Sequence, residues 1–151
     1  MEEMKARRLI EDRSISENTP SQYQIEHADY GQLPQNYQDI IRTYYKDKLF
    51  DPYTAVYEFA TPITGWKVLV DKESVDDQIR AVNEILAHKR RNPAYDPGSP
   101  FSPARARVLF GWICRGTINA KNRMGGYVGS EPFEFILVKG IPIKIEPRFN
   151  L

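Results

Sequence analysis

The chain of 151 residues has the usual size of one globular domain and is long enough to bury a core without disulfides or a structural metal. Its 21 basic and 20 acidic residues nearly cancel, so any affinity for nucleic acid or anionic lipid would need a local patch. The single cysteine, Cys114, excludes an internal disulfide and a zinc site built from several cysteines, and it leaves the redox compartment open.

Residues 1–33 are predicted to be an N-terminal arm or linker. Residues 1–13 are highly charged and could form a short helix, whereas residues 14–33 are rich in Ser, Asn, Thr, Pro and Gln and read as extended. No apolar run approaches the roughly 18–20 residues that a membrane-spanning helix needs. The N-terminus also lacks the apolar core of a signal peptide, so we expect any export signal to lie outside this sequence.

The first strong periodicity follows Pro34 and predicts a helix. One apolar stripe recurs at helical spacing and is made by Tyr37, Ile40, Ile41, Tyr44, Tyr45 and Leu49. The dipeptide Asp51-Pro52 is expected to end this helix, because a residue before proline avoids the helical conformation.

A second helix is predicted over residues 74–91, with Ser74 as its N-cap. Its acidic residues are concentrated at the start and its basic residues at the end, as the helix dipole favours. It is followed by residues 92–107, which hold four prolines and a glycine and are therefore predicted to be a long exposed loop.

Alternating apolar residues predict strands at 54–61, 66–70, 107–119 and 133–139, and a last strand begins at Ile141. This order predicts an α+β fold, in which an antiparallel sheet of about five strands carries one leading helix and one inserted helix packed on it. We expect a single domain over residues 34–151, with residues 74–107 as an insertion.

No motif in the sequence predicts catalysis, a cofactor or a metal site, so we expect a protein that is not an enzyme. The glycine-rich segment 125–129 lies between two predicted strands, which favours a hairpin loop over a phosphate-binding loop. The two histidines, His27 and His88, have no neighbouring metal ligands in the sequence. Cys114 lies at an apolar strand position and is expected to be a buried, unreactive thiol.

The candidate partner-binding residues are aromatic and basic side chains of the arm, the second helix and the proline-rich loop. They are Tyr23, Tyr30, Arg90, Arg91, Tyr95, Phe101, Arg105 and Arg107. An alternative is a nucleic-acid-binding module, because basic residues recur over 89–123 beside aromatic residues that could stack on bases.

Two segments together resemble small bacterial cell-envelope proteins, of the outer-membrane lipoprotein type, whose function is uncharacterised. Residues 37–59 resemble the first signature of these proteins, a helix followed by Leu-x-Asp-Pro and Ser/Thr-Ala-x-Tyr. Residues 116–135 resemble the second, Asn-Ala-Lys-Asn followed by Gly-Gly-Tyr-x-Gly and an aromatic strand. The chain lacks a lipobox cysteine, so the resemblance does not extend to a lipid anchor.

The resemblance implies a periplasmic or outer-membrane-associated location, although the sequence itself leaves a cytoplasmic one open. It also implies a structural or assembly subunit of an envelope complex, for which a type IV secretion outer-membrane complex is one setting. The expected partners are other protein subunits, and we expect the chain to be part of an oligomer.

Overall fold

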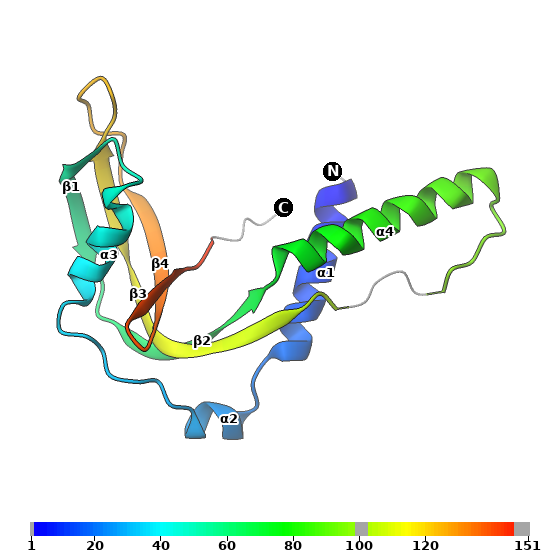
Figure 1. Ribbon diagram of the computed structural model, residues 1–151, viewed down its shortest axis with the longest axis horizontal. Helices are drawn as coiled ribbons and strands as arrows, with labels where there is room; N and C mark the ends of the chain where they lie inside the picture. The colour runs from blue at the N-terminus through cyan, green and yellow to red at the C-terminus, as the bar shows by residue number, and fades with distance from the viewer. Residues whose placement is uncertain (1, 99–102, 147–151) are drawn as a thin grey trace. The chain divides into compact units, whose positions relative to one another are not determined.

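The computed structural model describes residues 2–98 and 103–146 and divides the chain into two compact units (Figure 1). The helix unit comprises Met1–Ser21 and Val68–Val108, and the sheet unit comprises Gln22–Lys67 and Leu109–Leu151. This division differs from the predicted arm over 1–33 and single domain over 34–151. The N-terminal segment shares a unit with the predicted insertion at 74–107.

The strands form one antiparallel sheet, which confirms the predicted α+β fold class. The sheet has five strands: β1 (Asp51–Phe59), β2 (Ile63–Val70), β3 (Ala106–Lys121), β4 (Glu131–Val138) and β5 (Ile141–Lys144). Their order is β1-β3-β4-β5, with β2 paired to β3. The dipeptide Asp51-Pro52 begins β1, whereas the preceding helix has already ended at Lys46.

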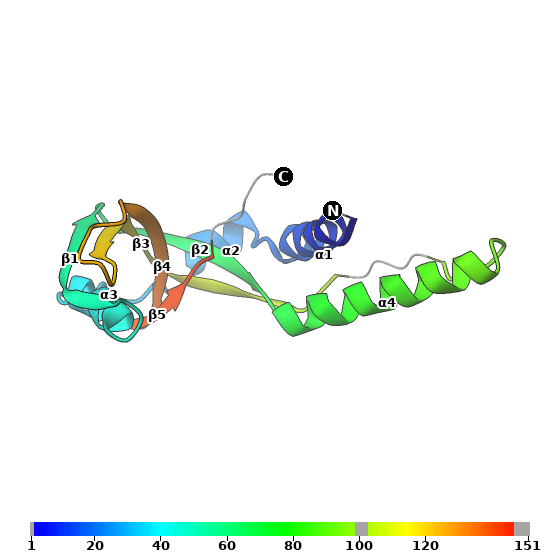
Figure 2. The same cartoon turned by 90° about the horizontal axis from the view of Figure 1, so that it is seen from above.

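Helix α3 (Tyr37–Lys46) covers one face of the sheet and contacts both β1 and β5, so the curved sheet wraps around it (Figure 2). The predicted apolar stripe supplies its buried residues, Ile41 and Tyr45. They pack against Cys114 and Ile118 of β3 and against an aromatic and aliphatic row of β4, as edge-to-face ring contacts between Tyr45 and Phe135 illustrate.

Two glycines of β3 allow neighbouring strands to approach closely. A Cβ atom at Gly116 would overlap the carbonyl oxygen of Glu58, and one at Gly111 would overlap the carbonyl oxygen of Leu137. A side chain at either position would therefore push a paired strand away.

In the helix unit, α1 (Glu2–Asn18) packs on α4 (Lys72–Arg91). Ile10 is fully buried with Val75, Ile79 and Ala104. The hydroxyl of Ser14, also fully buried, donates a hydrogen bond of 2.5 Å to the carbonyl oxygen of Ala104. Residues 2–18 therefore form a docked helix.

The expectation of an extended segment over 14–33 was wrong at two places. Residues 14–18 complete α1, and Gln22–His27 form the short helix α2 in the sheet unit. Helix α1 is hard to predict in full from the sequence, because few of its residues are buried. An isolated helix with so narrow an apolar stripe would be only marginally stable in water.

The N-cap of α4 is Asp71, three residues before the predicted Ser74. The Asp71 carboxylate accepts from the backbone N–H of Glu73, and its second oxygen pairs with the guanidinium of Arg105 at 3.2 Å. Ser74 is buried, and its hydroxyl donates to the Asp71 carbonyl while accepting from the N–H of Arg105. These bonds fasten the start of α4 to the chain that returns from the proline-rich loop.

None of the described helices is long and apolar enough to cross a membrane.

Candidate partner-binding surface

The glycine-rich loop between β3 and β4 is held in one conformation by its own hydrogen bonds. The side-chain oxygen of Asn122 accepts from the N–H groups of Met124 and Gly126 at 2.9 and 3.3 Å. Gly125 has a φ of 81°, which favours glycine. Val128 continues the ladder by donating its N–H to the carbonyl of Ala120. The predicted hairpin loop is confirmed.

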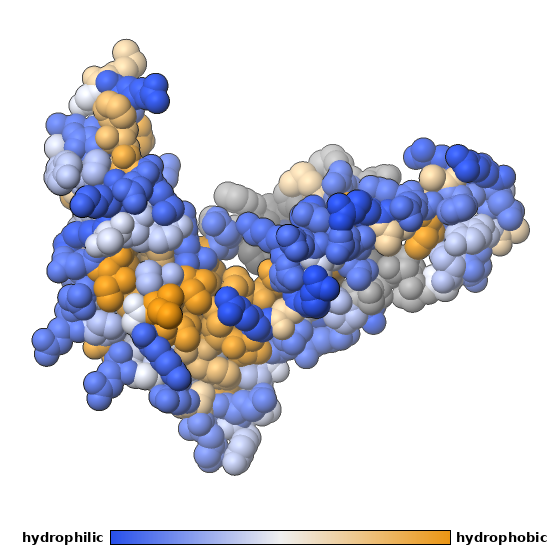
Figure 3. All heavy atoms as spheres, viewed as in Figure 1, coloured by the Kyte–Doolittle hydropathy of each residue, from blue (hydrophilic) through white to orange (hydrophobic). Residues whose placement is uncertain are grey.

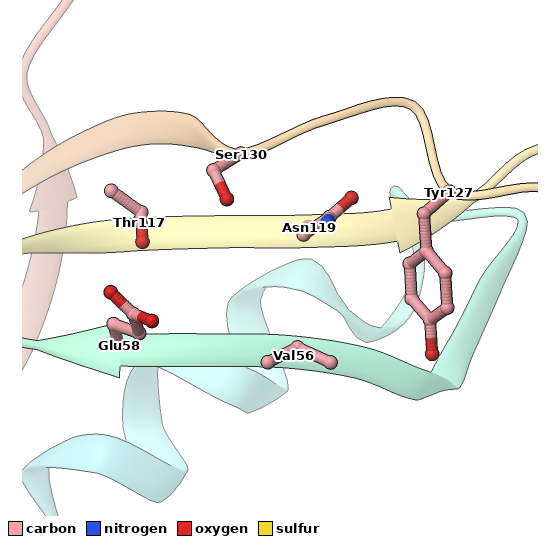
Figure 4. Close-up of a pocket in the computed structure, with 6 residues that line it drawn as sticks. All are labelled: Val56, Glu58, Thr117, Asn119, Tyr127 and Ser130. Atoms are coloured by element: carbon pink, nitrogen blue, oxygen red, sulfur yellow. The ribbon is translucent and has the colours of Figure 1, made fainter.

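Two hydrogen bonds also join the loop to strands β1 and β3. The Tyr127 hydroxyl donates to the carbonyl oxygen of Thr54 in β1 at 3.0 Å, and the Asn119 side-chain oxygen accepts from the N–H of Gly129 at 3.1 Å. Figure 4 shows the Tyr127 ring reaching from the loop toward β1. A loop fixed in this way loses little conformational freedom when a partner binds to it.

These contacts bring together the two segments that carry the resemblance. Val56 and Tyr57 of β1 lie opposite Asn119 and Ile118 of β3, so segment 37–59 pairs directly with segment 116–135. The Tyr127–Thr54 hydrogen bond is a second link between them. Both segments thus build one end of the sheet unit.

An open groove of about 280 Å³ lies between β1, β3 and the loop, on the face of the sheet opposite α3 (Figure 4). It is lined by Val56, Glu58, Thr117, Asn119, Tyr127 and Ser130. Because successive side chains of a strand alternate between its faces, the buried Ile118 points to α3 while Thr117 and Asn119 point into the groove.

Five large apolar side chains are exposed on β1 and the loop, and two of them, Val56 and Tyr127, line the groove. This surface, the loop patch, consists of Tyr53, Val56, Met124, Tyr127 and Val128, whose exposed fractions run from 49% for Tyr127 to 94% for Met124. Figure 3 shows tan and orange atoms beside blue ones on the loop at the top of the sheet unit. Exposed apolar side chains bordered by polar ones are typical of a protein-binding site.

A cluster of three charged side chains, partly buried, lies on the same face of the sheet as the groove and farther from the loop. Glu134 of β4 accepts from Lys67 at 2.8 Å and from its cross-strand partner Arg115. Burial alone would raise the pKa of Glu134, but the hydrogen bonds from the two cations outweigh it and hold the pKa below its usual value. The cluster ties three strands together.

On the helix-covered face, burial suppresses ionisation. It raises the pKa of the Cys114 thiol to about 11 and, with neighbouring phenols, that of Tyr45 to about 12. Cys114 is thus protonated near neutral pH, and the expectation of a buried thiol is confirmed. Within residues 2–98 and 103–146, no three His, Cys, Asp or Glu side chains gather where they could hold a metal ion.

The structure distributes the predicted partner-binding residues over both units. In the sheet unit, Tyr23 is exposed on α2 and stacks on His27, with ring centroids 4.0 Å apart. Tyr30 is half-buried; its hydroxyl donates to the Ile25 carbonyl, and its ring meets Phe110 edge to face. Tyr30 therefore serves packing in this chain.

The remaining predicted residues lie in the helix unit or outside the described part of the chain. Arg90 and Arg91 are exposed at the end of α4, and Tyr95 lies just beyond. Arg105 is paired with Asp71 at the other end of α4, and Arg107 is exposed on β3. Phe101 lies outside the described residues.

The predicted basic cluster over 89–123 is not gathered in one place. Helix α4 has 20 residues and is therefore about 30 Å long, so Arg90 and Arg105 lie near opposite ends of a long helix. Arg115 belongs to the sheet unit and is paired with Glu134.

The residues of the loop patch were not among the candidates predicted from the sequence. The sequence contains part of the pattern. Val56 and Glu58 lie on the same side of a predicted strand, and Val128 is an apolar residue in a glycine-rich loop. Nothing in the sequence showed that β1 and the loop lie together.

No protein-family model, no curated protein and no solved structure matches this chain.

Proposed function

We propose that this chain is a non-enzymatic assembly subunit that binds another protein through the loop patch. The observation that carries the proposal is the exposure of five large apolar side chains on a loop that is fastened to β1 and β3. Exposed Tyr and Met side chains of this kind are enriched in the centres of protein interfaces.

The polar side chains of the groove favour a protein as the partner, because their hydrogen bonds would fix the orientation in which it binds. The Asn119 oxygen is already occupied by the Gly129 N–H, so its amide N–H groups remain to donate to a partner. Glu58 and Thr117 add an acceptor and a hydroxyl beside it. Apolar side chains with such a polar border match the usual anatomy of a specific interface.

The proposed setting is a bacterial cell-envelope complex, with the chain in the periplasm or at the outer membrane. A type IV secretion outer-membrane complex is one such setting. The support is the resemblance of segments 37–59 and 116–135 to envelope proteins, together with the fact that these two segments build the loop patch. Binding of nucleic acid is the weaker alternative, because the basic side chains that suggested it are spread over both units.

Site-specific photo-crosslinking in the cells that produce the protein tests the proposal. A photoreactive amino acid at Met124, the most exposed residue of the loop patch, should give one discrete crosslinked product. The matched control is Lys46, which is exposed at the end of α3 in the same unit but outside the patch. Equal crosslinking at both positions, or none at Met124, would count against the proposal.

A further inference from the structure

The apolar stripe of α4 continues beyond the partners that cover it. Val75 and Ile79, in the first half of the helix, are 1% and 4% exposed beneath α1. One and two turns farther on, Val82 is half-buried and Leu86 is 45% exposed. The apolar stripe of α4 thus becomes progressively more exposed toward the end of the helix, where Leu86 is open to solvent.

Basic residues lie on this same stripe. A helix turns by about 100° per residue, so Lys89 and Arg90 project within roughly 60° of Leu86, whereas Glu84 projects from the opposite side. From Ile85 to Arg91 the helix has no acidic residue, and its last four residues are His88, Lys89, Arg90 and Arg91. Charge and apolar surface are therefore combined on one side of the helix end.

The chain that leaves α4 turns toward the other side. Asn92 closes the helix by donating its N–H to His88, and a turn from Asn92 to Tyr95 lays the Tyr95 ring against His88, with ring centroids 5.2 Å apart. His88 projects away from Leu86, since the two positions differ by about 160° around the axis. The Tyr95 ring is therefore packed on His88, on the side of the helix away from Leu86.

From this arrangement we infer that the end of α4, residues 82–91, binds the surface of a membrane that contains anionic lipids. Lys89 and Arg90 would pair with lipid phosphates while Leu86 and Val82 enter the boundary between headgroups and acyl chains. A bilayer surface fits better than nucleic acid, because nucleic acid offers no apolar layer for Leu86, and Tyr95, which could stack on bases, is already packed on His88. The inference is independent of the loop patch.

Flotation of the full chain with phospholipid vesicles tests the inference. We expect binding to vesicles of phosphatidylcholine and phosphatidylglycerol, weakening as salt is added, and no binding to phosphatidylcholine alone. The double variant Lys89→Glu/Arg90→Glu should bind at least about 25-fold more weakly, because each basic side chain near an anionic surface contributes about fivefold. Leu86→Asp should lower binding at least about tenfold, because it removes the apolar contact.

The matched control is Lys46→Glu/Arg123→Glu, which makes the same change in net charge at exposed positions of the sheet unit. It should bind vesicles as the unaltered chain does, and far-UV circular dichroism should show unchanged helix content in all variants. Equal weakening by the control would overturn the inference. So would equal binding to uncharged vesicles, or binding of single-stranded DNA through Lys89 and Arg90 with no vesicle binding.

Discussion

Replacing Ile10 by alanine should unfold the helix unit more readily, because this side chain is fully buried between α1 and α4. Truncating a buried isoleucine to alanine costs about 2–5 kcal/mol, which includes the lost transfer free energy and the cavity left behind. Leu9→Ala is the matched control: Leu9 is its neighbour in α1 but is 60% exposed, so the change should stay within about 0.5 kcal/mol. Alanine is the best helix former, so neither substitution weakens α1 intrinsically.

Hydrogen exchange measured by mass spectrometry tests whether Ile10→Ala destabilises the helix unit and Leu9→Ala does not. Since 1.4 kcal/mol corresponds to about tenfold in an equilibrium constant, Ile10→Ala should raise the opening of the helix unit by roughly 30-fold or more. Peptides from α1 and from the first half of α4 should lose protection together. If residues 2–18 exchange freely in the unaltered protein, or if the Ile10 and Leu9 variants exchange alike, then α1 is not docked and residues 1–33 are an arm after all.

Three further predictions concern the sheet unit. Gly116→Ala should destabilise the sheet unit by about 1–3 kcal/mol in urea unfolding, because the added methyl group overlaps the Glu58 carbonyl oxygen. Gly126→Ala is the control, because a methyl group there meets only open space. Equal urea midpoints for the two variants would contradict the packing of β1 on β3. Burial would raise the pKa of Glu134, but its two cationic partners hold that pKa below the usual value. The contribution of Glu134 to stability is therefore present above the usual glutamate pKa and is lost as pH falls through the lowered pKa. Glu134→Gln should reduce this loss of stability in acid, and an unchanged pH profile of stability would refute the pairing. Burial raises the pKa of Cys114 to about 11, so a thiol reagent at mildly alkaline pH should react only as fast as the sheet unit opens, and immediate labelling would be inconsistent with this.

The sequence predicted best where one element carries its own periodic signal. The stripe that includes Ile41 and Tyr45 identified α3, and the alternation in β3 and β4 identified the central strands together with the burial of Cys114. These residues are buried because their own element has a complete apolar face, which neighbouring residues in the sequence reveal.

The prediction failed where burial depends on a distant segment. Ile10 and Ser14 are buried by α4 and by Ala104, which lie far along the chain, so a highly charged α1 resembled a free tail. The cap of α4 was misplaced for the same reason, because Ser74 is occupied by the returning Arg105 backbone. The loop patch likewise requires β1 to lie beside a loop that follows β3.

The central claim is that the chain works inside a larger assembly through the loop patch, and the native size of the complex in cell extracts tests it most directly. Extracts would be compared for the unaltered chain, for the patch variant Val56→Asp/Val128→Asp, and for Leu9→Asp/Ile63→Asp, which alters exposed apolar side chains elsewhere. Protection of Cys114 from labelling would verify that the sheet unit of each variant is folded. We predict that the unaltered chain and the control migrate in a complex much larger than the chain, while the patch variant migrates as the free protein. A free, monomeric unaltered chain, or a patch variant that stays in the complex, would contradict the account.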